Sequence, residues 1–173
     1  MIYYNDEKIL IRDMSEDDGR IFCEGEKAQG WNSDISKFEM RILHQKEKKS
    51  VSLTAEYCGT PAGYIHIYPY GSGGPFKGSG YPEIVDFNVL EKYRRNGIGG
   101  RLMDAAERIA AGFSHTVCIG VGLHSGYGSA QRMYVKRGYI PDGSGVWYKD
   151  DVCKQYAPCC NDDELVLYLS KKL

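Results

Sequence analysis

The sequence lacks an apolar run long enough to cross a membrane. No stretch approaches the roughly 18 consecutive apolar residues that mark a membrane-spanning helix. Residues 1–6 also lack a basic stretch followed by an apolar one, which is the pattern of a secretory signal. These absences argue against a membrane or secreted protein and lead us to expect a cytoplasmic one.

An excess of charge of one sign is also missing. The chain has 22 basic and 23 acidic residues, a formal net charge of −1. Proteins that bind polyanions usually carry a basic excess, so we expect no nucleic-acid partner. The apolar fraction is 42% of 173 residues, and a chain of this size can bury about 70% of its unfolded surface. The composition therefore predicts a globular domain that is large enough to have a hydrophobic core and to be an enzyme.

Cysteine pairs with C-x-x-C spacing are absent as well. Of six cysteines, three fall late in the chain as Cys153, Cys159 and Cys160. Zinc sites prefer C-x-x-C pairs, which this spacing does not provide. A chain of this length without a secretory signal does not need a disulfide framework. We therefore expect reduced thiols and no metal site.

The most informative segment that is present is the glycine-rich run at residues 93–102, YRRNGIGGRL. Before it, residues 84–90 are strand-like, and after it residues 98–109 carry apolar side chains at helical spacing. Free backbone N–H groups and the positive end of a helix dipole meet at such a junction. Glycines allow close approach, and Arg94 and Arg95 add charge. The segment is predicted to hold a diphosphate.

The spacing distinguishes three glycine-rich motifs. A P-loop needs a Lys-Ser/Thr pair, but Gly99 is followed by Gly100 and Arg101. A dinucleotide-binding fingerprint needs a glycine where Leu102 stands. What remains is Arg-x-x-Gly-x-Gly after a strand, which resembles the acetyl-CoA signature of the GNAT acetyltransferase superfamily. The structural alternative is a glycine-rich turn with a solvated basic face.

The order of predicted elements resembles the whole GNAT fold. Strands are predicted at residues 8–14, 51–57, 62–70, 82–90, 115–122, from 139 onward and at 164–170, and helices at 17–28, 33–49, 97–112 and 127–138. The glycine-rich residues 70–80 predict a mobile loop. The resemblance implies an α/β (α+β) acyl-CoA N-acyltransferase fold, with a mixed central sheet of about seven strands flanked by four helices. We expect one domain over residues 1–173.

The resemblance also implies acetyl-CoA as the acetyl donor and a set of residues that bind it. In the family, pantetheine pairs with the strand edge that corresponds to Asn88 and Val89, and the glycine-rich turn holds the pyrophosphate. Tyr127 stands where the family usually has an Asn. The implied cofactor-binding residues are Asn88, Val89, Arg94, Arg95, Asn96, Gly97, Ile98, Gly99, Gly100, Ser129 and Ala130.

Acetyl transfer to an amine needs an acid and a base. Tyr134 matches the tyrosine that, in the family, donates a proton to the sulfur of coenzyme A, and it can equally be a core residue of an amphipathic helix. Glu83 and Asp86, on or just before a predicted strand, are the candidate bases, and His124 is an alternative because imidazole titrates near neutral pH.

The acceptor site in this fold is implied to lie around the first two helices and the long hairpin. Acidic and aromatic groups there suit a cationic amine; the residues chosen are Glu26, Trp31 and Tyr81, from a wider set of Glu24, Gln29, Asp34, Tyr68 and Tyr70. We expect an N-acetyltransferase that transfers acetyl to a primary amine of a small molecule by direct attack in a ternary complex. The alternatives are an acetyltransferase of protein N-termini or lysines, and a non-catalytic coenzyme A-binding domain. Residues 165–169 can complete the sheet or pair two copies into a homodimer.

Overall fold

The computed structural model describes residues 1–173, which form two compact units. The first unit comprises residues 1–68 and 84–109, and the second comprises residues 69–83 and 110–173. No helix is long and apolar enough to span a membrane. That the whole chain is one domain stays a prediction.

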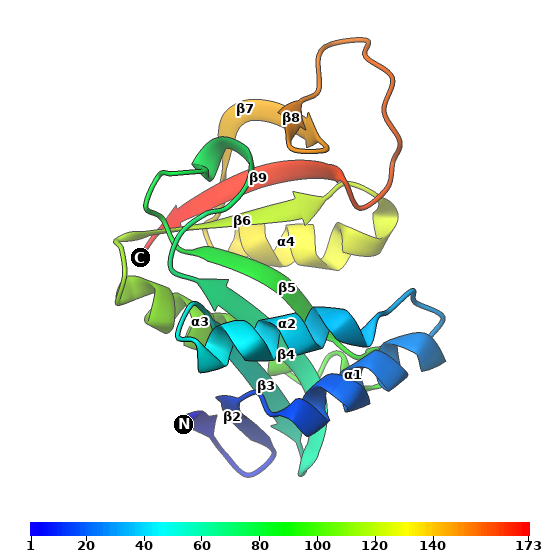
Figure 1. The fold of residues 1–173 in the computed structure, drawn as a ribbon, viewed down its shortest axis with the longest axis vertical. Helices are drawn as coiled ribbons and strands as arrows, with labels where there is room; N and C mark the ends of the chain where they lie inside the picture. The colour runs from blue at the N-terminus through cyan, green and yellow to red at the C-terminus, as the bar shows by residue number, and fades with distance from the viewer. The chain divides into compact units, whose positions relative to one another are not determined.

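The first unit is a sheet with helices (Figure 1). Its strands follow the order β1 to β5, and its first two helices run side by side, α1 packing on β4 and α2 on β3. The elements are β1 (Ile2–Asn5), β2 (Ile9–Asp13), α1 (Glu16–Ala28), α2 (Ile35–Lys46), β3 (Val51–Tyr57), β4 (Thr60–Tyr68), β5 (Glu83–Val89), the short helix η2 (Glu91–Tyr93) and α3 (Ile98–Ala111). Glu83 at the start of β5 and residues 110–111 at the end of α3 fall in the second unit.

Local sequence explains where α1 and α2 begin. The Ser15 hydroxyl accepts from the backbone N–H of Asp18, and the Asp18 carboxylate accepts from the N–H of Ser15, a capping box. Asp34 caps α2 through the N–H of Ser36. Inside, Phe22 of α1, Phe38 of α2 and Tyr64 of β4 form an aromatic core. Both helices therefore begin near the predicted residues and bury their apolar faces on the sheet.

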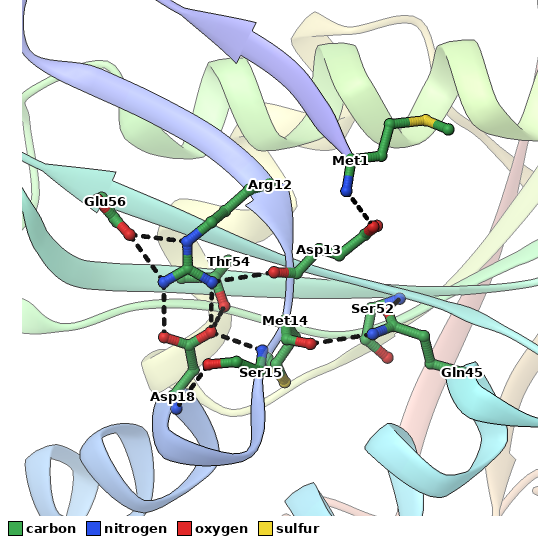
Figure 2. A network of polar contacts seen from close by, with 10 residues as sticks. All are labelled: Met1, Arg12, Asp13, Met14, Ser15, Asp18, Gln45, Ser52, Thr54 and Glu56. Carbon is green, nitrogen blue, oxygen red and sulfur yellow. Dashed lines mark hydrogen bonds and ion pairs between the residues drawn. The ribbon is translucent and has the colours of Figure 1, made fainter.

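A partly buried ion-pair network joins α1 to β2 and β3 (Figure 2). The Arg12 guanidinium donates to both Asp18 oxygens at 2.6 and 2.9 Å and to Glu56 at 2.7 Å. Thr54 adds a hydroxyl bond to Asp18 at 3.1 Å. Burial alone would raise the pKa of Asp18, but Arg12 and the Ser15 bonds lower it below its ordinary value. The network positions the N-terminal end of α1 on the sheet.

The second unit contains four strands in the order β6-β9-β7-β8. Its elements are η1 (Gly74–Phe76), β6 (Thr116–Gly122), η3 (Ser125–Tyr127), α4 (Gly128–Lys136), β7 (Ile140–Tyr148), β8 (Asp151–Val152) and β9 (Leu165–Lys172). Strand β9 pairs antiparallel with both β6 and β7. Residues 165–169 thus complete a sheet within this chain.

The segment predicted to be a mobile loop is tied down within this unit. The N–H of Gly74 donates to Asp150 at 2.5 Å, and Phe76 is buried with its ring 6.3 Å from that of Tyr168. The backbone and hydroxyl of Ser72 bond to Glu83. These contacts argue against a freely moving flap.

The predicted fold class is confirmed, with one correction. The chain forms four α-helices as expected but nine strands rather than about seven. The two additional strands are β1, which has four residues, and β8, which has two. Both are too short for an alternating pattern to identify them, and they form because a neighbouring strand offers them hydrogen bonds.

Candidate active site

The glycine-rich segment forms a turn that leads from η2 into the first residues of α3, which we call the Gly97 turn (residues 94–100). Arg95 and Gly97 adopt left-handed backbone angles, with φ of 63° and 80°. The N–H of Arg101 bonds to the carbonyl of Gly97 at 3.2 Å. The N–H groups of residues 98–100, in the first turn of α3, have no carbonyl one turn earlier in the helix to bind. The turn therefore presents donors at the positive end of a helix of 14 residues.

The space around this turn suits an anion. A Cβ at Gly97 or Gly100 would meet no atom within 4 Å, whereas one at Gly99 would lie 3.2 Å from the ring of Phe87. Gly99 packs against β5, which leaves little room for a side chain there, whereas Gly97 and Gly100 border open space. Arg94 and Arg95 are both exposed. The residues present fit a diphosphate bound through backbone N–H groups and two arginines.

Arg94 is held in place by its neighbours. Its Nε donates to the carbonyl of Val89 at 3.0 Å, and its guanidinium lies 5.5 Å from the centre of the Trp31 ring. Glu91 lies 3.6 Å away. Trp31, predicted to contact the acceptor, therefore has its ring against the arginine of the Gly97 turn.

A buried polar group, the Glu26 cluster, lies between the helices and the sheet of the same unit. Its members come from α1, α2, the loop between them, β4 and β5: Glu26, Ser33, Lys37, Tyr64 and Asn88. The Glu26 carboxylate is buried and accepts from Tyr64, from Asn88 at 3.0 Å, from Ser33 at 2.6 Å and from Lys37 at 3.4 Å. Each carboxylate oxygen thus has two donors. Burial and the neighbouring carboxylate raise the pKa of Tyr64 well above its ordinary value, so its phenol stays protonated.

A second group, the Arg41 cluster, follows along the same strands and contains Arg41, His44, Tyr68 and Asp86. Arg41 donates through Nε and a terminal nitrogen to one Asp86 oxygen at 2.9 and 2.7 Å, and to the Tyr68 hydroxyl at 2.7 Å. His44 Nδ1 is 2.7 Å from that hydroxyl. Burial alone would raise the pKa of Asp86, but Arg41, with His66 and Lys37, lowers it below its ordinary value. Asp86 is therefore an ionised partner of Arg41.

Asp86 also interrupts β5. Its φ is 47°, a left-handed conformation that L-residues seldom adopt. A left-handed residue inside a strand changes the direction of the side chains that follow, here Asn88 and Val89. Strand β5 is therefore irregular at Asp86.

His66 lies on the same face of β4 as Tyr64, with ring centres 5.5 Å apart. It is completely buried, and neither ring nitrogen has a hydrogen-bond partner. Burial lowers its pKa to about 3. His66 is therefore neutral at physiological pH.

The remaining predicted residues belong to the second unit. Tyr134 is buried on α4, with its ring 5.8 Å from that of Tyr139, and burial raises its pKa above the ordinary value near 10. On the same helix Ser129 is exposed and Ala130 half-buried. Glu83 is buried and accepts from Ser72 at 3.0 and 3.2 Å, and the Tyr81 ring packs on Phe76.

His124 is a partner of Asp163 in the loop before β9. Its Nε2 lies 3.1 Å from the Asp163 carboxylate, and its Nδ1 accepts from the N–H of Gly126 at 3.1 Å. This arrangement places the proton of a neutral ring on Nε2, where it is donated to Asp163. His124 therefore anchors a loop.

Comparison with known proteins decides the family. A model of the acetyltransferase (GNAT) family matches residues 12–139 of the 173. The chain belongs to the GNAT acetyltransferase family. It is therefore an acyltransferase, and acetyl-CoA is its acetyl donor, as the family resemblance implied. A search of curated protein sequences gives no significant match.

Solved structures show how widely this GNAT fold is shared. A ribosomal L7/L12 alpha-N-protein acetyltransferase, RimL, in complex with coenzyme A aligns with a TM-score of 0.72 at 12% identity, over 100% of this chain and 98% of that one. Ard1 from Thermoplasma volcanium gives 0.68 at 19%, over 96% and 98%. Arabidopsis thaliana Naa50, in complex with the bisubstrate analogue CoA-Ac-MVNAL, gives 0.64 at 13%, over 96% and 99%. At such identities the likeness concerns the fold.

The partners of Glu26 are what sequence reasoning missed in this GNAT chain. Glu26 was selected as one of several acidic residues on the first helix. Lys37 and Tyr64 carry no local motif, and the alternation of Tyr64, His66 and Tyr68 on β4 is the one signal that could have identified a polar face. Arg41 was not among the predicted residues.

Proposed function

We propose that this enzyme acetylates a primary amine whose ammonium group binds beside Glu26. The observation that carries the proposal is a buried carboxylate surrounded by Tyr64, Asn88 and Lys37 in the unit that also presents the Gly97 turn. Asn88 and Val89 are the proposed pantetheine edge. Glu26 bonds directly to Asn88, so an amine held by Glu26 lies next to that edge.

The favoured acceptor is the α-amino group of a protein or peptide N-terminus. One argument for it is that proteins of similar fold include a ribosomal-protein alpha-N-acetyltransferase and Naa50 with a peptide bisubstrate analogue. An α-amine also has a pKa of about 7.7–8.0, against about 10.4 for a lysine side chain. Near pH 8 about half of it is already the nucleophilic free base. A small-molecule amine, the acceptor first expected from the sequence, is the second candidate.

We assign the role of base to Glu26. Acetyl-CoA supplies an activated acetyl group in the form of a thioester. Glu26 orients the attacking nitrogen and takes up its proton, directly or through water. We prefer Glu26 to the other two candidates because it bonds directly to Asn88 of the proposed pantetheine edge, whereas Asp86 pairs with Arg41 and Glu83 bonds to Ser72.

Tyr134 is the proposed donor to the sulfur of the leaving coenzyme A, an assignment that rests on the family resemblance. Because burial raises its pKa, the phenol is protonated at neutral pH and is a weaker acid than free tyrosine. We therefore propose that Tyr134 mainly donates a hydrogen bond to the developing thiolate. Tyr134→Phe should lower kcat and leave acetyl-CoA affinity unchanged; a full kcat would contradict the role.

The test of the acceptor site is a transfer assay that measures coenzyme A release. Acceptors are peptides with different N-terminal residues, their N-terminally blocked forms, and small alkylamines. Glu26→Gln keeps the shape of the side chain and should lower kcat/KM by about 100-fold, whereas Glu24→Gln, an exposed residue on the same helix, should change it less than twofold. If Glu26→Gln keeps full kcat/KM with every active acceptor, the site is elsewhere.

A further inference from the structure

The ammonium group of Lys37 occupies the position that an acceptor's ammonium group would need. Lys37 Nζ lies 3.4 Å from a Glu26 oxygen and 3.1 Å from the Tyr64 hydroxyl. It also lies 4.6 Å from the centre of the Phe38 ring and 5.3 Å from that of Tyr64. A carboxylate, a hydroxyl acceptor and two aromatic rings together form a receptor for a primary ammonium ion.

The two charged partners differ in their exposure. The Glu26 side chain is 4% exposed, whereas that of Lys37 is 31% exposed. The carboxylate is fixed by three further donors from other elements. Lys37 has a flexible four-carbon stem with one end on α2, so it can withdraw toward solvent while Glu26 stays in place.

We propose that Glu26, Tyr64 and Phe38 form a primary-ammonium site whose resident occupant in the free enzyme is Lys37, and that the acceptor binds by displacing it. The proposal rests on the proposed function for the link to the acceptor. The presence of an ammonium site does not depend on that link.

Displacement has a consequence for turnover. The acceptor arrives as a cation that can replace Lys37 on Glu26, but the acetylated product is a neutral amide. Once Glu26 has released to solvent the proton that it took from the amine, it is again a buried carboxylate that a neutral amide cannot neutralise, so the Lys37 ammonium returns to Glu26 in preference to the product. Lys37 thus weakens acceptor binding and favours product release.

The test is rescue of a Lys37 variant by free ammonium ions, read as thermal stability. Lys37→Met leaves the buried carboxylate without a cation and should lower the melting temperature. Methylammonium or butylammonium chloride, at ten times the dissociation constant, should then raise it by about 3–6 °C relative to sodium chloride at the same concentration. Wild type and Lys37→Arg, whose sites are filled, should rise by less than about 1 °C.

Two further variants locate the effect. Lys27→Met, an exposed lysine of α1, is the matched control and should show no rescue. Lys37→Met with Glu26→Gln should lose the rescue, because the carboxylate that attracts the ion is gone. If Lys37→Met does not fold, Lys37→Gln, whose amide still donates to Glu26 but carries no charge, replaces it.

The proposal is overturned if alkylammonium ions stabilise the Lys37 variant no more than sodium does, or stabilise wild type equally. Failure of the proposed function is a separate result. An enzyme that shows rescue but acetylates no amine in the transfer assay would keep the ammonium site and lose its catalytic role.

Discussion

The Gly97 turn and the Glu26 cluster belong to the same unit of the protein but recognise charge in opposite ways. The turn uses backbone N–H groups and exposed arginines, in a contiguous run of seven residues, 94–100. The Glu26 cluster uses buried side chains that converge from two helices, a loop and two strands. A diphosphate needs several donors close together, which one turn can provide. Selecting a single ammonium ion needs a desolvated, shaped site, which only tertiary structure can provide.

The difference predicts where mutations are costly. At the turn, the charges are solvated, and each ion pair contributes little to the free energy of unfolding. In the buried clusters, each charge depends on its partner, and removal of one partner leaves the other desolvated. The next three predictions test that contrast from the largest expected effect to the smallest.

The ion pair between Arg41 and Asp86 should have the largest effect on stability. Arg41→Met leaves the Asp86 carboxylate without its cation and should lower the free energy of unfolding by about 3 kcal/mol. Adding Asp86→Gly removes the stranded charge and suits a φ of 47°, so the double variant should recover at least half of the loss. Urea denaturation measures both, with exposed Arg20→Met as the control. A double variant as unstable as Arg41→Met would contradict this explanation.

His66 should make stability depend on pH. Its pKa is about 3 in the folded protein and about 6.5 in the unfolded chain. Between these pH values the unfolded chain binds one more proton than the folded protein. Protonation of His66 in the unfolded chain therefore lowers the free energy of unfolding progressively as the pH falls below 6.5. From pH 7.5 to 5.5 the loss is about 1.4 kcal/mol.

His66→Leu should remove that part of the pH dependence, measured by urea denaturation at the two pH values. His115→Leu, at an exposed position, should retain it. An unchanged pH dependence in His66→Leu would mean that His66 is accessible to protons in the folded state.

Glu91 at the edge of the Gly97 turn should have the smallest effect. It lies 3.6 Å from Arg94, and both side chains are more than 40% exposed. Glu91→Ala should change the free energy of unfolding by less than about 0.5 kcal/mol, and it should leave acetyl-CoA affinity unchanged or slightly higher because a negative charge is lost. A loss above about 1.5 kcal/mol would show that surface pairs here behave like buried ones.

Features of the structure that depend on residues adjacent in the chain were predicted from the sequence. The Gly97 turn was predicted because its donors, glycines and arginines are contiguous. Helix α1 was predicted to begin at residue 17 and begins at Glu16, because the adjacent residues Ser15 to Asp18 contain its cap.

What was not predictable depends on residues far apart in the chain. The left-handed conformation of Asp86 coincides with a bond to Arg41, 45 positions earlier. The surroundings of Glu26 require Tyr64 and Asn88, from two different strands. Strands β1 and β8 exist through pairing with longer neighbours. No local pattern encodes such contacts, because tertiary packing determines them.

The most direct test of the division between the two regions is a calorimetric titration of acetyl-CoA into four proteins: wild type, Gly100→Ala, Gly100→Asp and Glu26→Gln. A Cβ added at Gly100 would meet no atom within 4 Å, so the alanine variant fits without a clash and the aspartate variant should fold. We predict binding to wild type, Gly100→Ala and Glu26→Gln with similar affinity, and at least about 100-fold weaker binding to Gly100→Asp, because a carboxylate then faces the diphosphate. Equal binding to Gly100→Asp, or loss of binding in Glu26→Gln, would contradict the assignment of the donor to the turn and the acceptor to the buried cluster.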